Sequence, residues 1–446
     1  MIGGVAAGTR AASKARRDDT SMEITIITEE EYISYAGCGL AYYIGGVVED
    51  RKLLFARSPE VFREKQNIEI LLRHRADRID TYDRMVHVTD LVAGSKNTLP
   101  FDRLLLATGA TPVIPPIDGV QAKGIFTLHT IPDADSIVSF LKSNMVKSTC
   151  IIGGGYIGVE MAENLSGRGI AVTVFEIESS LMPRMFDPDV SSIIAKHMES
   201  KGVHLALNTR VDTFLSDTTG TVSAVRAGGA EYDCGLAVLA TGVKPNVTLA
   251  REARIVLGAT GAIRVDEFME TSVRGVYAAG DCAESIHLVS RKPYWLPLGS
   301  TANKMGRVAG ANIAGGAKKF PGVLGTAIVK VFELAAGRTG LSEQESKNSG
   351  FNPVSVTVTT PARAGYFPGG GELTLKLTAD RGSKRILGAQ AVGDSSVDKI
   401  IDTMAAALTG NITVPGLTTI DLAYSPPFSQ ALGTVIVAAQ VIEEKL

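Results

Sequence analysis

The chain has 446 residues, of which 45% are hydrophobic and 21% are charged, and its formal net charge is −2. This composition is typical of a globular enzyme with two or three domains, and the lack of a basic excess argues against nucleic acid as a partner. No apolar run reaches the roughly 18 residues that predict a membrane span, no signal sequence is evident, and the few cysteines make no disulfide framework, so we expect a cytoplasmic protein.

The chain starts with a glycine-rich turn, Gly3-Gly-Val-Ala-Ala-Gly8, with only two residues before it that could form a strand. Either the native chain extends further upstream or this strand is shortened. The next apolar run ends at Thr28, where a dinucleotide-binding fold commonly has an acid, and Glu29 follows. Taken alone, this turn is an ambiguous signal for a nucleotide site.

Three basic residues follow the first turn at helical spacing. Arg10, Lys14 and Arg17 recur at i, i+4 and i+7 and would share one face of a helix. Such a face either binds phosphate groups or is a solvated helix surface, and the spacing agrees with both.

A lone cysteine, Cys38, lies in the segment Tyr-Ala-Gly-Cys-Gly-Leu-Ala-Tyr-Tyr-Ile. The positions four and five residues later are Tyr42 and Tyr43, so no local disulfide can form. If Cys38 is redox-active, its oxidised form is a sulfenic acid or a mixed disulfide with a small thiol; otherwise it is a small core residue. The residues after it predict a helix start, whose dipole would favour the thiolate.

Three apolar strands further along end in a glycine next to a polar residue, at 104–112, 239–246 and 275–281. The first two are near-duplicates, each with Thr-Gly before a proline-bearing turn, and they contain Thr108, Gly109 and Gly242. The third ends in Asp281, which could hold a ribityl hydroxyl or a flavin phosphate, because a buried carboxylate needs a partner. These strands support a nucleotide site at the first turn.

A second glycine-rich turn is the clearer one. Gly153, Gly155 and Gly158 lie between an apolar strand and a helix, and the next strand ends in Glu176. In a Rossmann unit such glycines form the turn, admit a pyrophosphate and let the helix pack on the strand. Glu176 would accept hydrogen bonds from a ribose 2′-hydroxyl and repel a 2′-phosphate, so NADH is favoured over NADPH; Arg184 could accommodate a phosphate instead.

The C-terminal part contains a strand at 326–333 and two unusual tyrosine segments, Gly-Tyr366-Phe-Pro-Gly and Ala-Tyr424-Ser-Pro-Pro-Phe. The double proline cannot continue a helix or a central strand, so Tyr424 should lie on a stiff loop. From the residues alone, both tyrosines are better explained by interface packing than by catalysis.

Together these residues resemble the FAD-dependent pyridine nucleotide–disulfide oxidoreductases over essentially the whole chain. The resemblance implies an α/β fold of two Rossmann-like dinucleotide-binding domains, the NAD domain nested in the FAD domain, plus a C-terminal α+β dimerisation domain. It places the FAD domain at 1–115 and 245–320, the NAD domain at 116–244 and the interface domain at 321–446.

Cys38 and the two tyrosine segments resemble the branch of coenzyme A–disulfide reductases and CoA-linked persulfide reductases. The resemblance implies that the cysteine alternates between a thiolate and a Cys–S–S–CoA disulfide, while Tyr366 and Tyr424 reach the substrate sulfur from the second subunit of a homodimer. Ala41 replaces the usual proline, and Ala6 stands where NADH peroxidases have a histidine, which argues against peroxidase activity. Some members carry a C-terminal rhodanese domain, and this chain stops at Leu446 without it, so either the protein never had that domain or the chain is a shortened form.

The resemblance also assigns binding residues, with no metal ligands. The FAD set is Gly3, Gly8, Glu29, Thr108, Gly109 and Asp281. The NAD set is Gly153, Gly155, Tyr156, Gly158, Glu160, Glu176 and Gly242. The CoA set is Arg10, Lys14, Arg17, Ser34, Asn303 and Lys65. Tyr156 resembles a gate that covers the flavin, although packing at a helix start explains it equally well.

The main alternative is an NADH oxidase, in which Cys38 becomes a sulfenic acid and oxygen is the oxidant. Both reactions share every cofactor motif, and only the basic helix and the tyrosine pair separate them. Within the CoA branch the sequence leaves disulfide, persulfide and polysulfide open, with a slight preference for the disulfide because no sulfur-carrier domain follows. A non-enzymatic redox sensor would need a protein-docking patch, and the composition indicates none.

Overall fold

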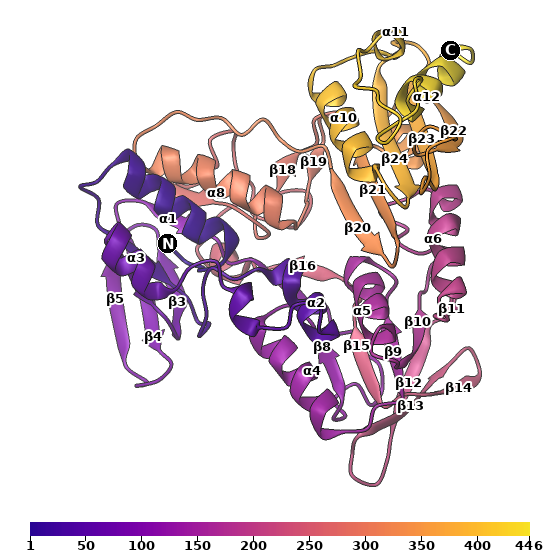
Figure 1. The fold of residues 1–446 in the computed structure, drawn as a ribbon. Coiled ribbons are helices and arrows are strands. Elements are labelled where there is room, and N and C mark those ends of the chain that lie inside the picture. The colour runs from indigo at the N-terminus through magenta and orange to yellow at the C-terminus, as the bar shows by residue number, and fades with distance from the viewer.

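The computed structural model describes residues 1–446, which form three sheet-centred domains (Figure 1). The N-terminal segment packs beside the later helix α8 (Gly299–Ile313), the middle of the chain forms the lower domain in this view, and the yellow C-terminal domain lies at the upper right. The first domain is therefore made from two parts of the chain that are far apart in the sequence.

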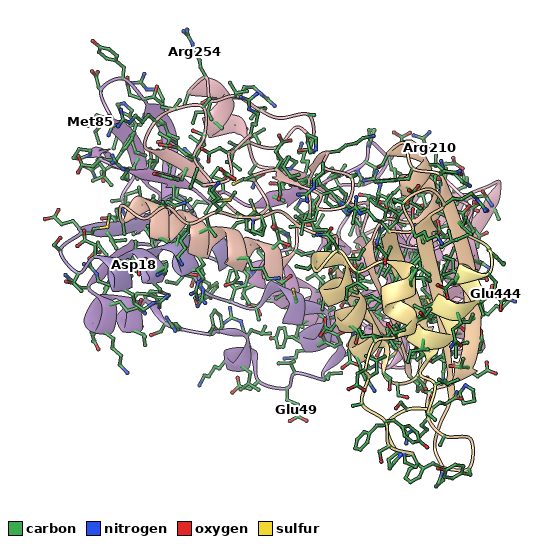
Figure 2. All side chains as sticks on the ribbon, turned by 90° about the horizontal axis from the view of Figure 1, so that it is seen from above. Asp18, Glu49, Met85, Arg210, Arg254 and Glu444 are labelled. Atoms are coloured by element: carbon green, nitrogen blue, oxygen red, sulfur yellow. The ribbon has the colours of Figure 1, made fainter.

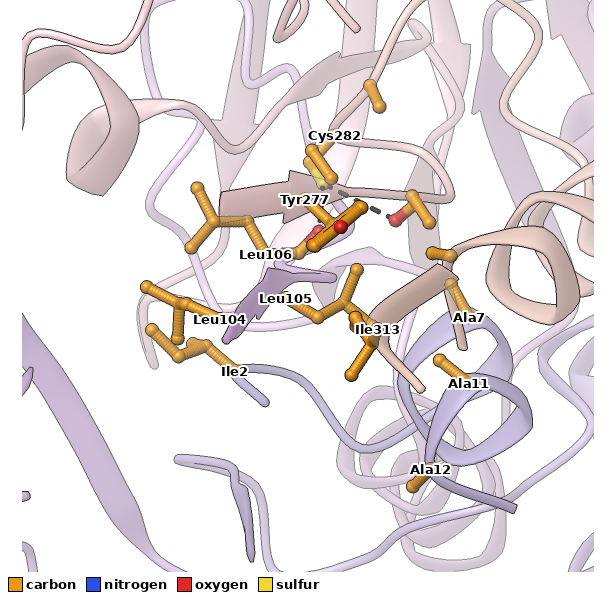
Figure 3. Packing of buried hydrophobic residues seen from close by; sticks show 14 of the residues in the cluster. Ile2, Ala7, Ala11, Ala12, Leu104, Leu105, Leu106, Tyr277, Cys282 and Ile313 are labelled. Atoms are coloured by element: carbon orange, nitrogen blue, oxygen red, sulfur yellow. Dashed lines mark hydrogen bonds between the residues drawn. The ribbon is translucent and has the colours of Figure 1, made fainter. Parts of the chain in front are cut away.

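The first domain is built on a parallel sheet of very short strands. Its order is β17 (Val276–Ala278), β6 (Leu104–Leu106), Ile2, β1 (Ile24–Ile27) and β2 (Ile68–Leu71). Ile2 stands in the place of the expected first strand as a single residue that bridges Leu106 and Ile27. Figure 3 shows Ile2 beside the buried leucines of β6, and burial of each such side chain contributes about 1.5–3 kcal/mol.

Helices α1 (Ala6–Asp18) and α8 (Gly299–Ile313) pack closely on this sheet. A Cβ added to Gly306 would lie 2.4 Å from the carbonyl oxygen of Ala7, and one on Gly310 would lie 2.3 Å from that of Ala11. Only glycine lets the two backbones approach this far. Figure 3 shows Ala7 and Ala11 on the α1 face that packs here.

An antiparallel sheet and several short elements complete the first domain. The sheet contains β3 (His74–Asp80), β4 (Met85–Asp90) and β5 (Lys96–Pro100). The short elements are the 3-10 turns Gly37–Gly39 and Arg51–Leu54, α2 (Leu40–Gly45), α3 (Pro59–Gln66), α7 (Thr248–Glu252), β18 (Ser285–Ile286) and β19 (Pro293–Tyr294).

The middle domain has a five-stranded parallel sheet with helices packed on it. The strand order is β11 (His204–Ala206), β10 (Ala171–Phe175), β9 (Ser148–Ile152), β15 (Leu236–Leu239) and β8 (Ile125–Thr127). The helices are α4 (Ile131–Ser143), α5 (Tyr156–Ser166) and α6 (Pro188–Ser200), and a small antiparallel sheet adds β12 (Val211–Ser216), β13 (Val222–Ala227) and β14 (Ala230–Asp233).

The near-duplicate segments form the two connections between these domains. Strand β7 (Ala110–Pro112) leads out of the first domain, β16 (Val243–Pro245) leads back, and the two pair antiparallel. Asn246 secures the crossing, because its side-chain amide donates to the carbonyl oxygen of Thr108 (2.8 Å) while the Thr108 hydroxyl donates to the Asn246 carbonyl oxygen (2.7 Å).

The C-terminal domain is an antiparallel sheet covered by helices (Figure 1). The strand order is β20 (Ala327–Val331), β21 (Leu334–Gly340), β24 (Ile386–Gly393), β23 (Glu372–Asp380) and β22 (Pro353–Pro361). The helices are α9 (Glu343–Asn348), α10 (Val397–Thr409), α11 (Val414–Thr418) and α12 (Thr434–Glu443).

Buried charges tie this domain to the middle one. Lys376 on β23 lies 3.2 Å from a carboxylate oxygen of Asp187 and 2.9 Å from one of Asp189, at the start of α6. Arg338 on β21 donates to the carbonyl oxygens of Arg184 (3.1 Å) and Met185 (3.0 Å). The expected α/β class, with two nested dinucleotide-binding folds and a C-terminal α+β domain, is confirmed, while the domain boundaries stay a prediction.

Candidate active site

Cys38 lies in the 3-10 turn that precedes α2, and its side chain is accessible. The first residue of α8, Gly299, packs against it: a Cβ on Gly299 would lie 3.9 Å from the Cys38 sulfur. The expected helix after Cys38 is present, but α2 has only six residues. The long helix whose N-terminus lies near the sulfur is therefore α8, which begins 261 residues further along the chain.

The electrostatics at Cys38 differ from the expectation drawn from the helix start. Burial raises the pKa of the Cys38 thiol, and the charges of Glu160 and Asp281 raise it further. The two carboxylates come from the two different nucleotide folds, so the sulfur lies where these folds meet. A thiolate at this position depends on positive charge or hydrogen-bond donors that outweigh both acids, and the α8 N-terminus is one such source.

Glu160 on α5 forms a pair with Tyr42 on α2. The Tyr42 hydroxyl donates to a Glu160 carboxylate oxygen at 3.4 Å. Burial raises the pKa of Glu160 to about 7, with a smaller contribution from Glu163. Glu160 was expected only as a nucleotide-binding residue, and the structure adds that its charge state bears on the sulfur.

Replacing Glu160 with glutamine is expected to lower the pKa of the Cys38 thiol. Above about pH 7 the Glu160 carboxylate is charged and opposes formation of the thiolate, and the amide removes that charge. The measurement is the pH dependence of iodoacetamide alkylation at Cys38, followed by mass spectrometry. Glu163→Gln, which changes a carboxylate paired with Lys330, should have a smaller effect. An unchanged or higher thiol pKa in Glu160→Gln would contradict the interpretation.

The first glycine turn and Asp281 fit a bound FAD. Gly3 has a φ of 113°, and a Cβ there would lie 2.0 Å from the Ala107 carbonyl oxygen; one on Gly8 would lie 1.9 Å from the Gly3 carbonyl oxygen. Asp281 follows β17, and its Oδ1 is buried without a hydrogen-bond partner in the protein. Burial raises the pKa of this carboxyl to about 6. A buried carboxyl without a protein partner can accept hydrogen bonds from the hydroxyl groups of a ligand.

The other predicted FAD residues have different surroundings. Thr108 and Gly109 lie in the loop after β6, and Gly109 has a φ of 69°. The Thr108 hydroxyl is bonded within the protein to the carbonyl of Asn246. Glu29 is exposed and has no ion-pair partner, while the neighbouring Glu30 accepts a hydrogen bond from Tyr35 (2.8 Å).

The second glycine turn has the geometry of a pyrophosphate site. Gly153 has a φ of 110° and a Cβ there would lie 2.3 Å from the Ala240 carbonyl oxygen; one on Gly158 would lie 2.0 Å from the Gly153 carbonyl oxygen. Gly155, by contrast, has open space beside it, which leaves room for a ligand to approach the backbone. Together with α5, these glycines provide the cradle that NAD requires.

Glu176 is buried at the end of β10 and also shapes this turn. One carboxylate oxygen accepts the backbone N–H of Gly154 (2.8 Å) and the other that of Glu178 (3.0 Å). Near the turn lies Tyr156, the first residue of α5, whose buried hydroxyl has no hydrogen-bond partner and whose pKa is raised mainly by burial. Gly242, with a φ of 93°, begins the returning connection.

The predicted CoA residues lie on several elements. Arg10, Lys14 and Arg17 are all on α1; Arg17 is exposed, whereas Lys14 pairs with Asp18. Because that pairing compensates its charge, Lys14 is a weaker candidate for a phosphate ligand than the spacing suggested. Arg16, between them, is buried and donates to four backbone carbonyl oxygens, so it is structural.

The three further CoA candidates lie on three different segments. Ser34 has a φ of 53°, a strained conformation for a non-glycine residue that is common at functional sites. Asn303 is on the first turns of α8, with its amide bonded to the Gly299 carbonyl oxygen (2.8 Å). Lys65 is exposed on α3.

Tyr366 and Tyr424 lie on adjacent loops of the C-terminal domain. The loops are joined by the N–H of Ala364, which donates to the Pro426 carbonyl oxygen (3.4 Å), and Tyr424 raises the pKa of the Tyr366 phenol. Tyr366 is 77% and Tyr424 48% exposed, with Phe428 69% exposed beside them. Exposure of three large aromatic side chains at one place is unusual for a monomer surface.

Three contributors to this site, Tyr42, Gly299 and Asn246, have no signature in the sequence. At position 42 the sequence indicates only that no second cysteine follows Cys38. The signal that could have indicated Gly299 is the segment Leu-Pro-Leu-Gly-Ser, in which a proline and a glycine precede a helical pattern. Their contacts with residues more than 100 positions away leave no local pattern.

Two nucleotide-binding cradles that meet at an accessible sulfur define an oxidoreductase that uses two dinucleotides. A family model described as pyridine nucleotide-disulphide oxidoreductase matches residues 1–302, and the dimerisation domain of the same family matches residues 326–436. The chain therefore belongs to the pyridine nucleotide–disulphide oxidoreductase family. No helix of the structure is both long enough and apolar enough to span a bilayer.

Several relatives resemble the chain over its full length. The NAD(P)H coenzyme A polysulfide/persulfide reductase of Pyrococcus horikoshii is 38% identical and covers 99% of this chain and 98% of its own. An NADH oxidase of Methanocaldococcus jannaschii is 34% identical, with 100% and 98% covered. The solved structure of an NAD-dependent persulfide reductase from A. fulgidus has 40% identity and a TM-score of 0.97, and it matches 100% of this chain and 82% of that chain.

Proposed function

We propose that the protein is an NAD(P)H-dependent flavoprotein that reduces coenzyme A disulfide or CoA persulfide through Cys38. The observation that best supports this function is the single accessible thiol of Cys38. It lies between carboxylates of the two nucleotide folds and has no second cysteine in reach. Such a sulfur must form its disulfide with a small thiol. The printed names of the P. horikoshii and A. fulgidus relatives support a persulfide among the acceptors.

The first glycine turn and Asp281 would hold FAD, and the second turn with Glu176 would hold NADH. FAD, when bound, carries two electrons from NADH to the sulfur substrate. The two glycine turns and Asp281 would hold the two nucleotides so that they approach each other near Cys38. Tyr156, buried with an unsatisfied hydroxyl, would lie at this meeting point as a gate.

Cys38 then performs the sulfur exchange. Its thiolate attacks a sulfur of CoA disulfide, a Cys38–S–S–CoA bond forms, the original S–S bond breaks and a CoA thiolate leaves. With CoA persulfide the same attack releases hydrosulfide. Two electrons from NADH return Cys38 to the thiolate and release the second CoA thiolate, so NADH, one proton and the disulfide yield NAD⁺ and two CoA thiols.

The two tyrosines would protonate the departing sulfur from the second subunit of a homodimer. Their loops project from the C-terminal domain, and loops in the colours of that domain extend away from its sheet in Figure 2. The match to a dimerisation domain supports a dimer in which these exposed phenols are covered by the partner. A phenol can donate its proton to a thiolate and stabilise the charge on it.

The test of this function compares oxidants in NADH consumption. We expect CoA disulfide or CoA persulfide to support faster turnover than oxygen. The mass of the non-reduced protein should show a CoA adduct on Cys38 that dithiothreitol removes. Oxygen turnover that matches or exceeds turnover with both CoA substrates would contradict the proposal.

That outcome would favour the second candidate, an NADH oxidase in which Cys38 cycles through a sulfenic acid. The M. jannaschii relative carries that name, and the accessible thiol suits it equally well. An oxygen reducer, however, needs neither the basic face of α1 nor the exposed tyrosines, so the CoA substrate explains more of the chain.

Nucleotide preference provides a further prediction. Glu176→Ala is expected to raise KM for NADH by about tenfold, because one charge-assisted hydrogen bond to the ribose is lost and the Gly154 turn loosens. The measurement is KM for NADH and NADPH in both proteins. A wild-type KM lower for NADPH than for NADH would show that Glu176 does not select the nucleotide.

A further inference from the structure

A cavity of about 540 Å³ lies beside the exposed tyrosines in the C-terminal domain. It is formed between the tyrosine-bearing loop and the start of α10. Its lining residues are Arg363, Ser396, Lys399, Ala423, Tyr424, Ser425, Pro427 and Phe428. Aromatic, hydroxyl and cationic groups thus share one cavity of a size that suits part of a small-molecule ligand.

Two cations of this cavity have no acidic partner. Neither Arg363 nor Lys399 forms an ion pair, whereas Arg338, Lys347 and Lys376 of the same domain do. Arg363 is three residues before Tyr366, and Lys399 is in the first turn of α10. Two uncompensated positive charges beside Tyr424 favour an anion.

The backbone accommodates the arginine in this position. A Cβ on Gly370 would lie 2.6 Å from Cγ of Arg363, so only glycine there lets the arginine side chain lie across the loop. The next residue, Gly371, likewise leaves room for the side chain of Asp394. A Cβ on Gly371 would lie 2.0 Å from a carboxylate oxygen of Asp394. These glycines therefore leave room for the Arg363 side chain beside the cavity. Asp394 also lies close to them, but it forms no ion pair with Arg363.

We propose that Arg363 and Lys399 bind a phosphate group of the CoA moiety whose sulfur lies at Cys38 of the partner subunit. The inference rests on the proposed function, because it takes the exposed tyrosines to complete the partner's active site. CoA carries a pyrophosphate and a 3′-phosphate, while Lys14 on α1 is already paired with Asp18. The second subunit then adds two cations to those that α1 offers, and an arginine gives bidentate contacts to a phosphate.

The experiment compares CoA disulfide with pantethine, which has the same disulfide and pantetheine arms without phosphates. Arg363→Gln and Lys399→Gln are each expected to raise KM for CoA disulfide about tenfold and to leave kcat/KM for pantethine unchanged. CoA binding, measured by titration calorimetry, should weaken by the same factor. Lys384→Gln is the matched control, since Lys384 is an exposed cation in the turn at the far end of β23.

Mixed dimers show which subunit supplies the cations. When an Arg363→Gln chain is paired with a Cys38→Ser chain, the only site that retains the cysteine receives Arg363 from the other chain. We expect this site to have the wild-type KM for CoA disulfide. A KM as high as in the Arg363→Gln homodimer would show that each Cys38 site uses the Arg363 of its own chain, and this result would overturn the proposal.

The remaining outcomes separate this inference from the proposed function. Unchanged KM and CoA affinity in both variants, with normal wild-type turnover, overturn the inference alone. Equal losses with CoA disulfide and pantethine, together with dissociation in sedimentation experiments, show that the cations pair with acids of the partner, which also overturns it. A wild-type protein that reduces neither CoA disulfide nor CoA persulfide refutes the proposed function itself.

Discussion

Replacing Cys38 with serine is expected to reduce turnover with CoA disulfide and CoA persulfide by at least about a thousandfold, because the hydroxyl cannot form the mixed disulfide. FAD content and the first reduction of the flavin by NADH should remain, since both depend on the two glycine turns. Stopped-flow absorbance separates the flavin step from steady-state turnover.

The matched control for this variant is Cys234→Ser. Cys234 is buried, and its sulfur donates to the Leu236 carbonyl oxygen at 3.2 Å, a hydrogen bond that a serine hydroxyl can also make. It should retain wild-type turnover. Full activity in Cys38→Ser, or loss of flavin reduction together with turnover, would show that the sulfur is not the redox group.

Replacing Tyr424 with phenylalanine is expected to lower kcat for CoA disulfide on the order of a hundredfold, because the departing CoA sulfur loses its proton donor. Tyr366→Phe should have an effect in the same direction, since the two phenols interact. Flavin reduction by NADH should be unaffected in both variants. The measurement is kcat and KM for CoA disulfide at several pH values, where loss of a phenol should change the basic limb of the profile.

Subunit mixing tests whether the tyrosines act across the dimer. Equal amounts of Cys38→Ser and Tyr424→Phe chains, after full exchange, should recover about one quarter of the wild-type activity, because half of the dimers are mixed and each of these has one intact site. If each tyrosine served its own subunit, no intact site could form and activity would stay near zero. Phe428→Tyr, on the same loop, is a control that keeps the aromatic side chain.

The sequence predicted the local part of the site well. Gly153, Gly155 and Gly158 have the turn, the open approach and the close packing that their spacing indicated. Asp281 is buried without a protein partner, as expected for a carboxylate reserved for a ligand. These features follow from a few neighbouring residues, and steric demands on glycine or on a buried charge act over that same short range.

The electrostatic part was predicted poorly. The helix start after Cys38 suggested a lowered thiol pKa, whereas burial and, to a smaller extent, the charges of Glu160 and Asp281 raise it. Glu160 is 122 positions and Asp281 243 positions away in the chain. No periodicity links residues so far apart, and only the packing of α2 on α5 and of α8 beside the turn brings their charges to the sulfur.

The sequence by itself determined the class of fold, the two nucleotide cradles and the solitary cysteine, because strand–turn–helix units and glycine positions are encoded within short segments. Only the tertiary structure decided what surrounds that cysteine: the start of α8, the Tyr42–Glu160 pair and the uncompensated cations beside Tyr424. These residues come together because separate helices and loops pack on one another. Such packing depends on the shape of entire surfaces, which no short segment of the sequence reveals.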